Sequence, residues 1–240
     1  MKRFGKLSEI NLDPSSWKGL NFLTFDLDWA CDEVIKFTVE KLIEKKIPAT
    51  IFVTHNSSYI EKIKNIDFFE FGPHPNFNFL CNSDSRYGNS VSEVLDFYEY
   101  ICTGSVIRSH DSFLKTEYLK EIALRKYSHE SNIFISRSPG MVIKPYKAWG
   151  NEVIRVPITW EDDEWVLSGT NRSKIKEQSN YQYNVWNFHP IHIFLNTEKL
   201  ERYSNIKEQQ HSLEILKTSI NKKEYGARSA FYEVIDYHEM

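Results

Sequence analysis

Short apolar runs alternate with amphipathic stretches along most of the chain. Residues 22–25 form an apolar run that predicts a buried strand, and residues 32–46 repeat apolar side chains at helical spacing until Pro48 ends the helix. Residues 49–54 are apolar and β-branched, which is typical of a buried parallel strand. The same reading predicts helices over 57–65, 91–102, 114–126 and the polar stretch 197–222, and strands over 68–71, 105–107, 132–136, 153–159, 183–188 and near 230–235.

The sustained alternation of strand and helix indicates the α/β class with mostly parallel strands. It fits either a (β/α) barrel or an open doubly wound sheet. The chain has 240 residues, 41% of them hydrophobic, which is enough for one sizeable core. Because no linker-like or repeated segment divides the sequence, we expect a single domain over residues 1–240, with a core at about 20–197 and a C-terminal helix and strand over about 197–240.

Composition argues against several classes of function. The net charge of -3 gives no electrostatic reason to expect nucleic acid or an anionic membrane as a partner. No apolar run is long enough to span a bilayer, and no signal peptide is visible, so we expect no transmembrane segment and a cytoplasmic location. The three cysteines are odd in number and far apart, which argues against disulfides and a cysteine-based zinc site.

Two aspartates follow the first predicted strand directly. Asp26 and Asp28 are two residues apart, so in an extended segment their side chains would share a face. Two close carboxylates repel each other unless a cation lies between them or one takes a proton. A divalent metal ion is the usual cation, since carboxylate oxygen is a natural ligand for such ions. A polar strand end that faces water is the alternative for this short motif.

Further candidate residues come just after later strands of the predicted sheet. If the strands are parallel, their carboxyl ends meet at one rim, which is where active sites of β/α folds collect. Several such residues together are harder to explain as ordinary surface positions than any one alone. The residues expected at this rim are Asp26, Asp28, His74, Arg108, His110, Asp162, Asp163 and His189.

An ordered set of short motifs runs through the same part of the chain. They are T-F-D-L-D at 24–28, A-T-I-F-V at 49–53, G-P-H-P-N at 72–76, R-S-H at 108–110, W-E-D-D at 160–163 and F-H-P at 188–190. The set resembles the polysaccharide deacetylase superfamily (NodB homology, carbohydrate esterase family 4) over about residues 20–197. It is most similar to the divergent WbmS-like branch, which is associated with surface-polysaccharide biosynthesis.

The resemblance implies a deformed seven-stranded (β/α) barrel that binds one divalent metal ion, commonly zinc. By the family's pattern, Asp28 corresponds to a metal ligand and His74 to the first histidine of the family's H-x-x-x-H motif. The second histidine of that motif falls on Asn78, whose amide is a poor zinc ligand. A catalytic zinc normally has three protein ligands. We expect His110 to replace the missing histidine, with Asn78 as the alternative ligand.

The resemblance also implies catalytic roles. Asp26 corresponds to the general base, and Arg108 to the arginine that steadies this base. His189 corresponds to the general acid, which a carboxylate of the Asp162–Asp163 pair would tune. Arg137, in the sequence R-S-P-G, matches the family's R-x-P element more literally than Arg108 does, but Arg108 fits the spacing from the preceding motif and the strand order better.

These roles imply a metal-dependent hydrolase that deacetylates an N-acetyl amino sugar in a glycan or glycan precursor. A related amidohydrolase acting on a non-sugar C–N bond is the first alternative. A non-catalytic glycan-binding protein is the second, and the asparagine at position 78 is its main support. A glycosidase that pairs Asp26 with Asp162 or Asp163 is the third. The sequence leaves open the sugar, the acyl group and the oligomeric state.

Overall fold

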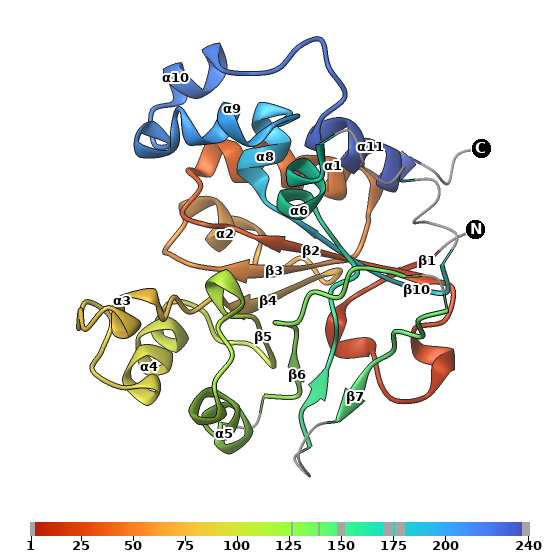
Figure 1. Ribbon diagram of the computed structural model, residues 1–240, viewed down its shortest axis with the longest axis vertical. Coiled ribbons are helices and arrows are strands. Elements are labelled where there is room, and N and C mark those ends of the chain that lie inside the picture. Colours follow the sequence, from red (N-terminus) through yellow and green to blue (C-terminus); the bar gives the residue numbers. More distant parts are fainter. Residues whose placement is uncertain are drawn as a thin grey trace.

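Parallel strands at the centre and helices around them make up the computed structural model of the chain (Figure 1). It describes residues 3–125, 127–138, 140–147, 152–169, 175 and 181–236. The strands are β1 (Arg3–Gly5), β2 (Leu20–Asp26), β3 (Ala49–Val53), β4 (Phe69–Pro73), β5 (Val106–Ile107), β6 (His129–Glu130), β7 (Tyr146–Lys147), β8 (Ile154–Arg155), β9 (Trp160–Glu161) and β10 (Tyr183–Phe188). The main helices are α1 (Asp32–Lys45), α2 (Ser58–Ile63), α3 (Asn78–Cys81), α4 (Val91–Ile101), α5 (Thr116–Leu124), α6 (Asp162–Leu167), α8 (Pro190–Leu195), α9 (Leu200–Ser204), α10 (Leu213–Thr218) and α11 (Ala227–Asp236).

The strands pair in two sheets that join into a distorted ring. One sheet has the order β4-β3-β2-β10-β9, with β1 also paired to β2, and the other has the order β5-β6-β8-β7. All pairings are parallel except that of β7 with β8. The two sheets are joined at two places. At one, residues 154–161 run from β8 in one sheet into β9 in the other. At the other, β4 meets β5, and the Arg108 amide donates to the Pro73 carbonyl oxygen (3.4 Å). The α/β class with mostly parallel strands is therefore confirmed.

Two glycines allow β4 and β5 to approach each other closely. A Cβ atom on Gly72 would lie 2.3 Å from the carbonyl oxygen of Val106, and one on Gly104 would lie 2.1 Å from that of Phe71. Both distances are too short for a carbon atom and a backbone oxygen, so neither position has room for a side chain. The seam between the sheets therefore depends on bare backbone at these two positions.

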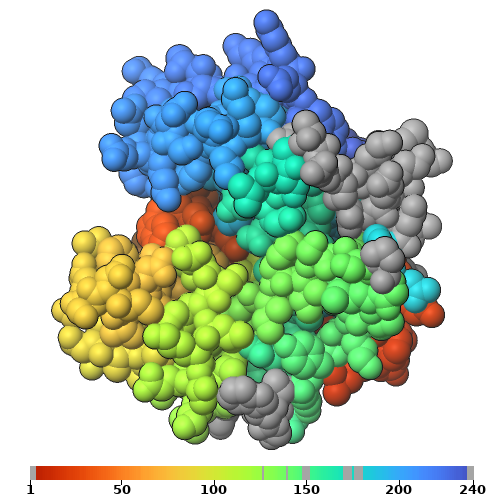
Figure 2. Space-filling model, viewed as in Figure 1, coloured from red at the N-terminus to blue at the C-terminus, as the bar shows by residue number. Residues whose placement is uncertain are grey.

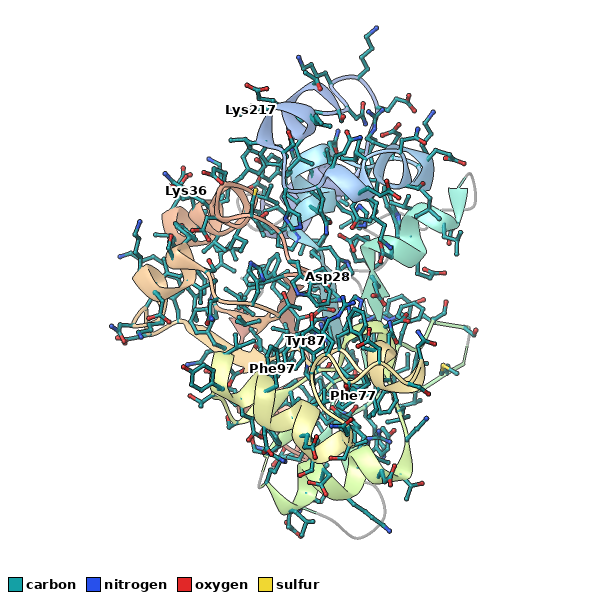
Figure 3. All side chains as sticks on the ribbon, turned by 90° about the vertical axis from the view of Figure 1, so that its left-hand side faces the viewer. Asp28, Lys36, Phe77, Tyr87, Phe97 and Lys217 are labelled. Carbon is teal, nitrogen blue, oxygen red and sulfur yellow. The ribbon has the colours of Figure 1, made fainter. Side chains whose placement is uncertain are left out.

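Buried apolar side chains fill the ring and both of its flanks. Leu7, Phe22, Phe52, Val106 and Val185 belong to a cluster at the centre of the ring, beneath the rim where the strands end. The largest cluster lies between β2, β3 and β10 and the helices α1, α8 and α11. A third cluster packs α4 and α5 against β5, and Figure 3 shows three of the aromatic residues of this region, Phe77, Tyr87 and Phe97.

The prediction of a C-terminal strand near residues 230–235 is wrong. Residues 227–236 form helix α11, which packs against α8. Its buried residues are Ala227, Ala230, Phe231, Val234 and Ile235, and these recur at intervals of three and four, as on one face of a helix. The aromatic and β-branched composition of the segment suggested a strand, but the helical period of its apolar residues decides the structure.

Other differences concern short elements in the second half of the chain. The strand predicted over 132–136 is reduced to a single bridge, Phe134 to Ile158, and the regular strand β6 lies just before it. Asn132 binds a neighbouring loop instead, because its side-chain amide donates to the Phe113 carbonyl oxygen (2.7 Å). The helical stretch predicted over 197–222 is divided into α9, the 3-10 turn Lys207–Gln209 and α10. No helix in the described part of the chain has the length and hydrophobicity needed to cross a membrane.

We predict that Gly72→Ala destabilises the protein by about 1–3 kcal/mol, because the new methyl group overpacks the backbone of β5. Thr103→Ala, which changes an exposed side chain near the same seam, is the matched control. Chemical denaturation measures the free energy of unfolding of both variants. Equal stabilities would show that the seam can widen without cost.

Candidate functional site

The carboxyl ends of β2, β4, β5, β9 and β10 surround a cavity of about 500 Å³. Figure 2 shows this face of the molecule hollowed where early, middle and late parts of the chain meet. In Figure 3, Asp28 lies between the C-terminal helices, above it in this view, and Phe77, below it. The residues that line the cavity are Asp26, Asp28, His74, Arg108, Ser109, His110, Asp111, Ser112, Ile158, Glu161, Asp163, Glu164, Leu167, His189, Leu200 and Tyr203.

Asp26 and Asp28 reach this cavity through a turn rather than along a strand. β2 ends at Asp26, and Asp28 and Trp29 have left-handed backbones with φ of 42° and 58°. Such φ values cost energy in residues other than glycine, so the surroundings must hold the turn. One such contact is the bond from the Trp29 amide to Thr54 Oγ1 (3.0 Å). The prediction that strand alternation brings the two carboxylates together was therefore wrong, although both side chains line the cavity.

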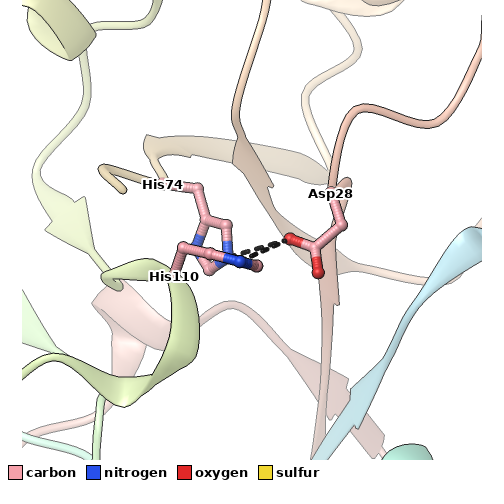
Figure 4. A group of neighbouring side chains, drawn as sticks. All are labelled: Asp28, His74 and His110. Atoms are coloured by element: carbon pink, nitrogen blue, oxygen red, sulfur yellow. Dashed lines mark hydrogen bonds and ion pairs between the residues drawn. The ribbon is translucent and has the colours of Figure 1, made fainter. Parts of the chain in front are cut away.

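Asp28 lies against two histidines from different strand ends. Its Oδ1 atom is 3.3 Å from His74 Nε2 and 3.1 Å from His110 Nδ1, and both contacts are drawn in Figure 4. Burial raises the pKa of Asp28, but hydrogen bonds from His110 and His74 and the charge of His189 outweigh it and lower the pKa well below its ordinary value. Burial also lowers the pKa of His110, but Asp28 more than offsets this and raises it overall. Asp28 is therefore ionised.

The donor atoms of this group have the chemistry and spacing of a metal site. His74 Nδ1 donates to the Arg108 carbonyl oxygen (2.8 Å), so in a neutral imidazole the lone pair is on Nε2, which faces Asp28. Two facing lone pairs repel, and a cation between them or a proton on Nε2 removes that repulsion. Ligands of a tetrahedral zinc ion lie about 3.3 Å apart, which is close to the 3.3 Å and 3.1 Å separations here. Asp28, His74 and His110 thus fit a divalent metal ion.

Asn78 lies outside this group. It begins α3, and its side-chain amide donates to Asp111 Oδ2 (3.3 Å) on the exposed edge of the cavity. The structure brings His110 to Asp28 and His74, whereas the Asn78 amide binds Asp111 and Asn78 does not line the cavity.

Asp26 is buried beside a cation. Arg108 Nη1 donates to Asp26 Oδ1 (3.0 Å), and His74 and His189 each place Nε2 at 3.9 Å from Oδ2. Burial raises the pKa of Asp26, but the charges of Arg108, His74 and His189 outweigh burial and lower it. Asp26 is thus an ionised carboxylate that is itself only 4% exposed.

Arg108 is held from several sides, and two of its partners, Ser131 and Asn187, lie outside the quoted motifs. Its Nε and Nη2 atoms donate to the carbonyl oxygen (2.7 Å) and hydroxyl (2.8 Å) of Ser131, and its guanidinium lies 4.4 Å from the ring centre of Phe52. Asn187 binds both Arg108 and Asp26. Its Oδ1 atom accepts from Arg108 Nη1, and its Nδ2 atom donates to Asp26 Oδ2 (2.9 Å). The alternation of β10 could have identified Asn187, which is two residues from His189.

Arg137, the alternative to Arg108, lies elsewhere. It donates to Asn184 Oδ1 (2.8 Å) and Thr159 Oγ1 (3.0 Å), and it covers the ring of Tyr181 at 4.2 Å. Tyr181 lies just before β10 and Asn184 near its start, whereas the cavity lies at the opposite end of this strand, beside His189. Its match to the family's R-x-P element therefore does not place Arg137 beside Asp26.

His189 faces both aspartates and is bound from behind by Asp162. Its Nε2 lies 3.7 Å from Asp28 Oδ2, and its Nδ1 donates to Asp162 Oδ1 (2.6 Å). The His189 amide donates to the other oxygen of Asp162 (2.8 Å), so both oxygens of this buried carboxylate are occupied by His189. Burial lowers the pKa of His189, but Asp163, Asp162 and Asp28 raise it well above its ordinary value. His189 is therefore a protonated imidazole.

Two further carboxylates, Asp163 and Glu161, line the cavity. Asp163 lies 3.9 Å from His189 Nδ1 but 2.6 Å from Nε2 of the buried His192, which no motif identified. Glu161 accepts from Asn187 Nδ2 (3.3 Å), and burial raises its pKa to about 7 although His189 opposes this. The structure thus places Asp162, rather than Asp163, in direct contact with His189.

The comparisons with known proteins agree with this geometry. The family model described as WbmS-like polysaccharide deacetylase matches residues 23–207. The chain is 33% identical to WbmS of Bordetella bronchiseptica, described as a candidate polysaccharide deacetylase involved in O-antigen biosynthesis. That similarity covers 98% of both chains with a TM-score of 0.89.

More distant structures share less. A candidate polysaccharide deacetylase from Mycobacterium smegmatis is 13% identical over 91% of both chains, with a TM-score of 0.42. The peptidoglycan N-acetylglucosamine deacetylase Bc1960 is 14% identical, covers 83% of this chain and 81% of its own, and also has a TM-score of 0.42. No curated protein matches this chain.

We predict that Glu161→Gln flattens the pH dependence of stability in the metal-free protein. Glu161 holds its proton to about pH 7 in the folded state, against an ordinary pKa of 4.5. Its contribution to stability is therefore fully present below about pH 4.5 and is lost as the pH rises through about 7, by up to about 3 kcal/mol. Denaturation at pH 5 and pH 8 with a chelator present measures this. Glu117→Gln, an exposed change of the same charge, is the control, and parallel wild-type and Glu161→Gln profiles would contradict the assignment.

Proposed function

The chain belongs to the WbmS-like polysaccharide deacetylases, and from that premise we propose that it is a metal-dependent hydrolase that removes the acetyl group from an N-acetyl amino sugar. One observation carries the proposal. The Asp26 carboxylate and the His189 imidazole lie beside a group that fits a divalent metal ion: Asp26 Oδ2 is 3.9 Å from His74 Nε2, and His189 Nε2 is 3.7 Å from Asp28 Oδ2. A candidate base, a candidate acid and a metal site therefore meet in one cavity.

The proposed metal ligands are Asp28, His74 and His110. They provide one carboxylate and two imidazoles, the donor set of many catalytic zinc sites, which leave a fourth position open. A divalent ion bound there lowers the pKa of a water molecule and polarises a carbonyl oxygen. Zinc is the metal that we propose, because imidazole ligands suit it well.

In the proposed reaction, Asp26 acts as the general base. Its carboxylate takes a proton from the water that attacks the acetyl carbon, and Arg108 and Asn187 hold its two oxygens in position. His189 acts as the general acid and gives its Nε2 proton to the departing nitrogen, since an amine is a poor leaving group until it is protonated. Asp162 fixes the proton on Nδ1 of His189 and so leaves Nε2 facing the cavity.

The substrate that we propose is an acetylated sugar of a surface glycan or its precursor. The printed description of WbmS, which connects that protein with O-antigen biosynthesis, supports this assignment. A cytoplasmic location, where nucleotide-linked and lipid-linked precursors are made, is part of the same proposal.

We predict that Asp26→Asn lowers the rate of acetate release by roughly 10²–10⁴-fold while the protein still binds zinc. Asparagine keeps the shape of the side chain but is not a base at neutral pH. Acetate release and zinc content are measured on the same preparation, with Asp111→Asn at the exposed edge of the cavity as the control. An Asp26→Asn enzyme with most of the wild-type rate would remove this residue from the mechanism.

We predict that His110→Ala and His74→Ala each weaken zinc binding by more than roughly 100-fold, since the loss of a residue behind a ligand already costs 10–100-fold. Asn78→Ala should change the affinity little, because its amide is bonded to Asp111. Competition with a chromophoric chelator measures the three affinities. Loss of zinc from the Asn78 variant and its retention by the His110 variant would reverse the ligand assignment.

A further inference from the structure

We propose that Asp163 binds a hydroxyl group of the sugar that carries the scissile N-acetyl group, and that the buried His192 positions Asp163 for this contact. The inference rests on the proposed deacetylase function and names a group of the substrate that the same cavity recognises.

Asp163 has one bound and one open carboxylate oxygen. It lies in the first turn of α6, in the wall of the cavity, and its side chain is 48% exposed. Oδ1 is 2.6 Å from His192 Nε2. Oδ2 is 3.9 Å from His189 Nδ1, but that nitrogen directs its proton to Asp162. Among the described residues, no donor lies within hydrogen-bond distance of Oδ2, so this atom can accept a bond from a molecule in the cavity.

His192 is built to hold that carboxylate. It lies in α8 and is only 3% exposed. Its Nδ1 is 3.0 Å from the hydroxyl of Thr197, which can donate to it and leave the proton on Nε2, facing Asp163. The ring of Tyr203 packs edge-on at 5.0 Å. An acceptor fixed in this way loses little conformational entropy when a ligand binds.

The charges of the cavity wall indicate which donor would come to Asp163. Asp111, Glu161 and Glu164 also line the cavity, and Arg108 is the only arginine or lysine among the residues that line it. Arg108 is buried and bonded to Asp26, so a phosphate group would meet these carboxylates without a free arginine or lysine to bind it. An uncharged hydroxyl group of the sugar can donate a hydrogen bond to this acidic wall without charge repulsion.

A second metal ion is the alternative use of these residues, because Asp163, His189 and His192 form a group of possible ligands. The His189 nitrogen nearest to Asp163 is Nδ1, which is already bonded to Asp162 at 2.6 Å. This leaves two donors, Asp163 and His192, where a zinc site normally takes at least three. The geometry therefore favours a hydrogen-bond acceptor.

The test combines protein variants with deoxy sugars. The methyl glycosides of N-acetylglucosamine and N-acetylgalactosamine are the probes, and the 3-, 4- and 6-deoxy forms of the better substrate are compared on the wild-type enzyme and on Asp163→Ala. Asp163→Ala should lower kcat/KM for the full substrate by roughly 10-fold to 100-fold, the usual effect of a hydrogen bond to a charged group. One deoxy sugar should show the same loss on the wild-type enzyme and no further loss on the variant.

Two controls separate recognition from a structural role. Glu117→Gln, at an exposed carboxylate outside the cavity, should keep kcat/KM within a few-fold of wild type. His192→Gln should lower kcat/KM in the wild-type background but add nothing to Asp163→Ala, with unchanged zinc content in all variants. Three results would each overturn this inference but leave the proposed function standing. The first is wild-type activity of Asp163→Ala, and the second is an additive loss for every deoxy sugar. The third is two zinc ions per wild-type chain, one of which is lost in Asp163→Ala. Failure of the wild-type enzyme with zinc to release acetate from either glycoside would instead overturn the proposed function, and the inference with it.

Discussion

Two ionised aspartates at the end of one strand can stay close together only if positive charge surrounds them. Asp26 and Asp28 both line the cavity, and their carboxylates lie within 3.9 Å of His74 and of His189. Burying such groups costs several kcal/mol each unless they are paired, and leaving one unpaired typically costs about 3–5 kcal/mol. The arrangement at the ends of β4, β5 and β10 follows from this constraint, because each of these ends brings a cation, a histidine or a hydrogen-bond donor to the two carboxylates.

The constraint is met differently at the two positions, and this gives them different chemistry. Asp26 is bound by Arg108 and Asn187, so its charge is balanced by groups that do not leave it. Asp28 faces His74 and His110, whose donor atoms also suit a metal ion. His189 Nε2 lies within 3.9 Å of both carboxylates, and Asp162 binds the Nδ1 atom of the same ring. The residues that bind each side chain thus decide whether it is suited to act as a base, a metal ligand or an acid.

Much of this arrangement could be predicted from the sequence because parallel strands bring their carboxyl ends to one rim. The apolar runs located β2, β3, β4 and β10, and residues at the ends of β2, β4 and β10 line the cavity. Contacts that depend on the backbone path could not be predicted in this way. The left-handed turn at Asp28, the support of Arg108 by Ser131 and the pairing of Asp163 with His192 involve residues 23 or more positions apart or unusual φ angles, which periodicity does not report.

Crystals of the zinc-loaded protein, with diffraction data collected on both sides of the zinc absorption edge, would locate the metal ion. We predict one anomalous peak, within bonding distance of Asp28, His74 and His110 and away from Asn78. A peak held instead by Asp163, His189 and His192, or no peak in crystals of a protein that hydrolyses acetylated sugars, would contradict this prediction.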